Sequence, residues 1–210
     1  RWKGTGGRVH WEGTTFNDSL QFAELNEYEI KLSGSSFRTS PVILHTELID
    51  RDLVGSLSVK VKSSKSPDDK FYPKFESRDE RLILKNVYPN MDFEGGVVVR
   101  GSRLDGTSVS GVPGYLKIYH EDTLFIRCAV DEILFQNDGF VASKVGMSIY
   151  LDEDSIHHPS IGVRYDRKSE LVRFIRDEDG IGLQAFSDSY HKMDFQVEAL
   201  TWKLSGKTID

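Results

Sequence analysis

Residues 145–151, VGMSIYL, carry the pattern that decides the fold class. Every odd position in this stretch is apolar, whereas Gly, Ser and Tyr occupy the even positions. Successive side chains of a β-strand point to opposite faces of a sheet, so this alternation predicts a strand with one buried face. The same period recurs at 28–32 and 57–61, where polar residues separate Tyr, Ile, Leu and Val. The repeated period of two predicts strands along much of the chain.

The composition also favours an all-β domain. The 210 residues include 17 Val, 13 Ile and 9 Thr but only five Ala, so residues that suit a pleated sheet outnumber the best helix former. Short turn sequences at 137–139 and 166–169 separate apolar runs, as in β-hairpins. We therefore predict an antiparallel two-sheet sandwich or jelly roll, with an elongated open β-roll as the alternative.

Three segments depart from simple alternation. Residues 97–99 are consecutive Val, which predicts a central strand covered on both faces. Along 193–204 the apolar positions change from odd to even at Ala199 and Leu200. This change predicts a β-bulge or a strand that passes from one sheet to the other. Residues 16–25 are the best helix candidate, because Asn or Asp could cap their first turn.

The length favours a single domain over residues 1–210, because a chain of this size can bury a sizeable core. The polar segment 62–70 is expected to be a flexible loop that either separates two lobes or forms the tip of a long hairpin. No run reaches the roughly 18 apolar residues of a membrane-spanning helix. The chain begins at Arg1 without a Met, so we expect it to be part of a longer protein.

Charge narrows the classes of partner. The formal net charge is −6, and residues 106–210 hold the excess, with 17 acidic against 11 basic residues. Without a Lys/Arg cluster, a nucleic-acid partner is not expected. Cations, neutral ligands and other proteins remain as classes of partner. The single Cys128 lies in an alternating apolar run and is expected to be a core residue.

The segment 152–158, DEDSIHH, is the richest group of metal-ligating residue types. Asp152 and Asp154 are two residues apart, so an extended backbone would point both carboxylates to one side. With one imidazole from His157 or His158, and with His191, they supply the ligand types of a divalent cation such as zinc or manganese. The alternative is a solvated exit from a strand, since no spacing matches a defined metal motif. A divalent cation is the only cofactor that the sequence suggests.

Three tryptophans, Trp2, Trp11 and Trp202, are candidates for a flat platform that binds sugar rings. The alternative is that they pack in the core or at a sheet edge. No catalytic residue is assigned, because nucleophile and phosphate-loop motifs are absent. Paired carboxylates of a glycoside hydrolase stay open, since such residues meet from distant strands.

Part of the chain resembles a known group of proteins. The residues that carry the resemblance are GGVVVRG at 95–101, SIYLDEDSIHHP at 148–159, RDEDG at 176–180 and DSYH at 188–191. Over residues 92–204 the sequence is similar to a segment of very large, uncharacterised cell-envelope proteins of Bacteroidota. The resemblance implies an extracytoplasmic setting, in the envelope or secreted, and no catalytic residues. The short strands with Gly turns also resemble open β-rolls of envelope lipid-transport proteins, whose apolar inner face carries acyl chains.

Together these observations favour a non-catalytic binding or structural module of a larger envelope or secreted protein, with a glycan or another protein as partner. The first alternative is a carbohydrate-active enzyme, which needs two carboxylates facing each other across a cleft, roughly 5 to 9.5 Å apart. The second alternative is a lipid-binding β-roll, which needs a groove with an exposed apolar lining.

Overall fold

The computed structural model describes all residues except 12–21, 32, 35, 46–51, 61–71, 78–79, 102, 177–179, 207 and 210. The predicted all-β antiparallel class is confirmed. Within the described residues the one helical element is the short 3₁₀ turn η3 (Gly180–Leu183). No helix in this part of the chain is long and apolar enough to cross a membrane.

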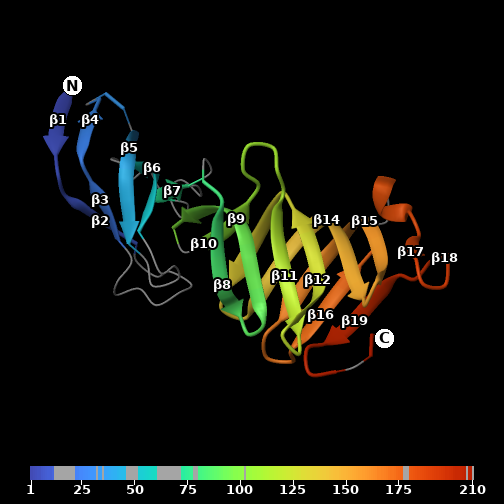
Figure 1. Ribbon diagram of the computed structural model, residues 1–210. Helices are drawn as coiled ribbons and strands as arrows, with labels where there is room; N and C mark the ends of the chain where they lie inside the picture. The colour runs from blue at the N-terminus through green and yellow to red at the C-terminus, as the bar shows by residue number, and fades with distance from the viewer. Residues whose placement is uncertain are drawn as a thin grey trace.

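The N-terminal strands form one end of an elongated molecule (Figure 1). Here β1 (Trp2–Thr5) and β4 (Glu27–Ile30) pair as a separate two-stranded sheet. The neighbouring strands form an antiparallel series that reaches β9 through β7: β2 (Arg8–His10), β3 (Phe22–Leu25), β5 (Ser36–His45), β6 (Leu53–Lys60) and β7 (Lys74–Glu76).

Six strands at the centre close into a flattened ring. In pairing order they are β9 (Met91–Arg100), β10 (Arg103–Thr107), β13 (Glu132–Gln136), β14 (Gly139–Leu151), β12 (Thr123–Val130) and β11 (Gly114–His120), which returns to β9. β9 pairs with β11 along its first half and with β10 along its second half. β14 likewise pairs first with β13 and then with β12, so both strands belong to two layers. β8 (Leu82–Tyr88) also pairs with β9.

The C-terminal strands extend both layers beyond the ring. β15 (Asp154–Asp166) pairs with β14 along nearly its whole length. Its first half then pairs with β17 (Phe186–Asp188), which pairs with β18 (Met193–Phe195). Its second half pairs with β16 (Leu171–Ile175), which pairs with β19 (Ala199–Lys203). The two layers therefore share β9, β14 and β15, an arrangement that fits a β-sandwich or a β-roll.

The structure shows what the segments without simple alternation form, as far as it describes them. Residues 97–99 are buried within β9, as predicted. The change of phase near Ala199 marks a passage between layers, because β18 pairs with β17 whereas β19 pairs with β16. The predicted helix at 16–25 is wrong for residues 22–25, which form β3, and its earlier residues lie outside the described part. The predicted loop at 62–70 also lies outside it.

The interior of the ring is filled by side chains. The Phe93 ring lies against Gly95, Gly106 and Gly114, which come from β9, β10 and β11. A Cβ atom added at these glycines would lie 2.6, 2.5 and 2.8 Å from Phe93 Cζ, so the three glycines make the space that the ring occupies. Phe93 is fully buried, together with side chains from every strand of the ring.

Candidate functional site

The segment 152–158 does not form a loop that leaves the sheet. Asp152 and Glu153 form the turn of the long β14–β15 hairpin, and Asp152 adopts a positive φ of 55° there. Asp154 begins β15, so alternation places its side chain on the face that Ile156 shares and His157 on the opposite face. The strand geometry therefore separates two of the four predicted metal ligands.

Three of the four ligand candidates, Asp154, His157 and His191, have hydrogen-bond partners of their own. The β15–β17 pairing brings the turn after β17 beside the start of β15, where the Ser189 hydroxyl donates to Asp154 at 2.8 Å. His191 donates from Nδ1 to Asp188 at 2.7 Å. Ser148 Oγ lies 3.2 Å from Nδ1 of the exposed His157. No group of three or more His, Cys, Asp or Glu residues in the described part of the chain could hold a metal ion. Asp152, Asp154, His157 and His191 thus lie in one region without forming a metal centre.

The contact between His191 and Asp188 leads to a testable prediction about the pKa of the Asp188 carboxyl group. This contact is the main reason that the pKa of Asp188 is lowered, and the N–H groups of Tyr190 and His191 add to the effect. Substitution His191→Ala is therefore expected to raise the pKa of Asp188, because it removes the contact that lowers this pKa most. Carboxyl NMR titration measures this pKa directly.

The lowered pKa of Asp188 determines how the stability of the fold changes with pH. Asp188 stabilises the fold above the pKa it has in the unfolded chain, and this stabilisation is lost as the pH falls through its folded pKa. The His191→Ala variant should therefore lose less stability on acidification than the wild type. The pKa of Asp166, which Ser169 lowers, is the internal control and should not move. An unchanged Asp188 pKa would show that His191 does not act on it.

The three tryptophans do not share a surface. Trp11 is 2% exposed and donates from Nε1 to the Pro73 carbonyl at 2.9 Å. Trp202 is 1% exposed, donates to the Gly206 carbonyl at 3.0 Å, and its ring centroid lies 4.8 Å from that of Phe125. Both indoles are core residues with a satisfied N–H group, so the predicted three-tryptophan platform is not formed. Trp2, by contrast, is 52% exposed.

Trp2 belongs to a different set of rings, which we name the aromatic group: Trp2, Tyr28 and Phe37. The Trp2 and Tyr28 rings meet edge to face with centroids 5.8 Å apart, and Tyr28 stacks on Phe37 at 5.7 Å. Gly4 pairs with Tyr28, and the Tyr28 ring occupies the space that a side chain at Gly4 would need. Tyr28 is thus held on two sides.

A depression of about 450 Å³ adjoins the aromatic group. Its lining residues are Lys3, Gly4, Thr5, Glu27, Tyr28 and Glu29. The pairing of β1 with β4 places the four charged and hydroxyl side chains on one face of the two-stranded sheet and the Trp2 and Tyr28 side chains on the other face. Sequence reasoning finds Trp2 but not Tyr28, because the alternation of apolar and polar residues along 28–32 predicts that Tyr28 lies on a buried face. The signal available in the sequence was an aromatic residue between two acidic ones.

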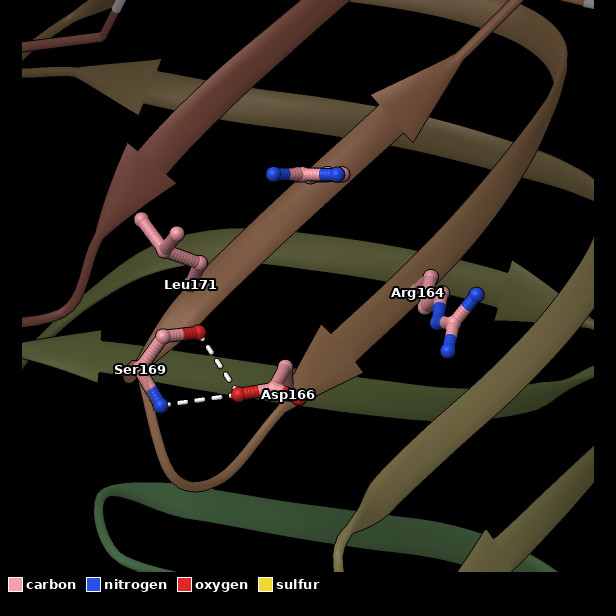
Figure 2. Close-up of a pocket in the computed structure, with 5 residues that line it drawn as sticks. Arg164, Asp166, Ser169 and Leu171 are labelled. Atoms are coloured by element: carbon pink, nitrogen blue, oxygen red, sulfur yellow. Dashed lines mark hydrogen bonds between the residues drawn. The ribbon is translucent and has the colours of Figure 1, made fainter.

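A second depression, of about 400 Å³, lies on the β15–β16 hairpin (Figure 2). We name it the basic depression, and its lining is Arg164, Asp166, Ser169, Leu171 and Arg173. Ser169 donates to Asp166 Oδ1 from its N–H group at 2.8 Å and from its hydroxyl at 2.6 Å, as Figure 2 shows. These two bonds are the main causes that lower the pKa of Asp166. The sequence predicted this hairpin turn, but not the site on it.

Neither depression has carboxylates arranged for glycoside hydrolysis. Glu27 and Glu29 are two residues apart on one strand, so they share a face instead of facing each other. Asp166 is the one carboxylate lining the basic depression, and its lowered pKa keeps it ionised at neutral pH. An ionised carboxylate cannot serve as the general acid.

Comparison with known proteins finds no match: no family model, no curated protein and no solved structure is similar to this chain.

Proposed function

We propose that this chain is a non-catalytic binding module that recognises a glycan through the aromatic group. The observation that carries the proposal is the half-exposed indole of Trp2, whose ring meets that of Tyr28 edge to face. The electron-rich face of an aromatic ring attracts weakly positive C–H groups, which line the faces of sugar rings. Binding sites for small ligands combine such apolar surfaces with a few placed polar groups.

The support of the aromatic group favours binding. Tyr28 is fixed by Phe37 on one side and by the close approach of Gly4 on the other. A ring that is already held in place loses little conformational entropy when a ligand binds. These features suit a ligand with a flat face that stacks on an aromatic ring.

Two observations weigh against the alternatives. The carboxylates of both depressions lack the facing geometry that a glycoside hydrolase needs, and the pKa of Asp166 is lowered, whereas a general acid needs a raised pKa. A lipid-binding roll needs an exposed apolar lining, whereas the inward side chains of the ring, such as Phe93, Phe135 and Met147, are fully buried. For the setting, we propose a larger envelope or secreted protein, which the resemblance over residues 92–204 supports.

The proposal predicts that Trp2→Ala weakens glycan binding by at least about tenfold, because an exposed Trp that contacts a ligand typically contributes more than 1.4 kcal/mol. Native affinity electrophoresis through gels that contain soluble β-glucan, xylan or mannan tests this. We expect at least one polysaccharide to retard the wild type, and the variant to migrate as it does in a gel without polysaccharide.

Tyr190→Ala is the matched control for Trp2→Ala. Tyr190 is 67% exposed but follows β17, at the other end of the molecule (Figure 1). This variant should be retarded like the wild type. If no polysaccharide retards the wild type, or if Trp2→Ala is retarded equally, the aromatic group is not a glycan site.

A further inference from the structure

Two arginines of the basic depression are paired across neighbouring strands, and the depression holds one carboxylate, Asp166, to balance them. Arg164 on β15 is the direct cross-strand partner of Arg173 on β16, and both side chains are exposed. Like charges placed directly opposite each other destabilise a sheet. Among the described residues, neither guanidinium forms an ion pair within 4.0 Å. The chain has a net charge of −6 but contains this pair of arginines, which disfavours folding. A bound anion that supplies a counterion would explain why the pair is present.

The other lining residues restrict what that anion is. Asp166 stays ionised because Ser169 donates two hydrogen bonds to it. Two arginines and one aspartate leave the depression with a single positive charge, which matches a monoanion. A dianion such as sulfate or phosphate would be repelled by the Asp166 carboxylate at short range. The same carboxylate has acceptor capacity beyond the two bonds from Ser169, and hydroxyl groups are suitable donors.

We propose that the basic depression binds a sugar that carries one carboxylate. Arg164 and Arg173 hold the carboxylate, since planar guanidinium groups bind carboxylates through paired hydrogen bonds. Asp166 accepts a hydroxyl group of the ring, and Leu171 provides an apolar contact for its C–H face. The volume of about 400 Å³ is in the usual range for small-ligand sites. This site lies far along the molecule from β1 and β4 and does not depend on the aromatic group (Figure 1).

The test is an NMR titration of the 210-residue chain with sodium D-glucuronate, compared with D-glucose and with sodium sulfate. We expect glucuronate to shift the backbone signals of residues 164–173 and to bind more tightly than either comparison compound. Arg164→Gln and Arg173→Gln should each weaken glucuronate binding by at least about tenfold, as expected for a lost charged hydrogen bond.

Lys85→Gln is the charge-matched control, because Lys85 is exposed on β8, a different part of the fold. It should bind glucuronate like the wild type. The two arginine variants should also keep or raise the Tm of the wild type, because each removes a like-charge contact. Retained Tm with lost binding separates a ligand site from a structural role.

Three results would overturn the proposal. If Lys85→Gln weakens glucuronate binding as much as the arginine variants do, the overall charge of the protein, and not the basic depression, attracts the anion. Sulfate binding as tight as glucuronate binding would mean that the site does not select a carboxylate sugar. Absence of a glucuronate-induced shift at 164–173 would mean that the depression is not a site. Trp2→Ala should leave glucuronate binding unchanged. A negative result for the basic depression can therefore be distinguished from a negative result for glycan binding by the aromatic group.

Discussion

Substitution Phe93→Ala is expected to lower the free energy of unfolding by about 4 kcal/mol, as for other large aromatic side chains removed from a packed core. The ring lies fully buried against Gly95, Gly106 and Gly114 on three neighbouring strands. Glycines have no side chain that could move into the space. The cavity would therefore remain open, and the closure of the six-strand ring would lose its central contact.

Urea unfolding of the wild type and of Phe93→Ala measures this loss. The control is Ile83→Ala, because Ile83 lies on the neighbouring strand β8 and is 60% exposed. The control should change the free energy of unfolding by less than about 0.5 kcal/mol. A loss below about 1.5 kcal/mol in Phe93→Ala would show that the strands collapse around the missing ring, contrary to the packing described here.

The second large effect on stability is expected for Tyr88→Phe, at about 2 kcal/mol. The Tyr88 hydroxyl lies 2.6 Å from the Gln136 carbonyl, also contacts the Gly139 carbonyl, and accepts the Gln136 N–H group at 3.1 Å. It thereby ties the end of β8 to the β13–β14 turn. Burial raises the pKa of Tyr88 to about 12, so the hydroxyl stays protonated and able to donate at neutral pH. Removing it leaves backbone groups without their partner.

Thermal or urea unfolding tests this prediction, with Tyr190→Phe as control, because Tyr190 is exposed and its hydroxyl forms no hydrogen bond within the described residues. The control should match the wild type. Equal stability of Tyr88→Phe and the wild type would mean that water replaces the hydroxyl at the turn.

The strands were predictable because their cause is local. Alternation at 145–151 predicts a half-buried strand, and the structure places these residues in β14, with Val145, Met147 and Ile149 buried. The turn at 137–139 likewise predicts the β13–β14 hairpin. The sharing of β9 and β14 between two layers was not predictable, because it depends on which half of each strand pairs with which partner.

The candidate sites were less predictable because they depend on register and burial. Asp154 and His157 belong to one acidic and histidine-rich segment, yet strand alternation directs them to opposite faces. Composition could not separate the buried Trp11 from the exposed Trp2. Arg164 and Arg173 meet only because the β15–β16 hairpin closes with a defined register. Side-chain chemistry is visible in a sequence, whereas the partners of a side chain are set by the whole fold.

The most direct test of glycan recognition by the aromatic group uses the indole N–H signals of the three tryptophans. Trp11 and Trp202 are buried with hydrogen-bonded N–H groups, whereas Trp2 is half exposed and its ring contacts that of Tyr28. The proton–nitrogen correlation spectrum is recorded while an oligosaccharide of the polysaccharide that retards the chain is added. The account predicts a saturable shift of the Trp2 signal, with the Trp11 and Trp202 signals unchanged. Saturable binding that leaves the Trp2 signal in place would contradict it.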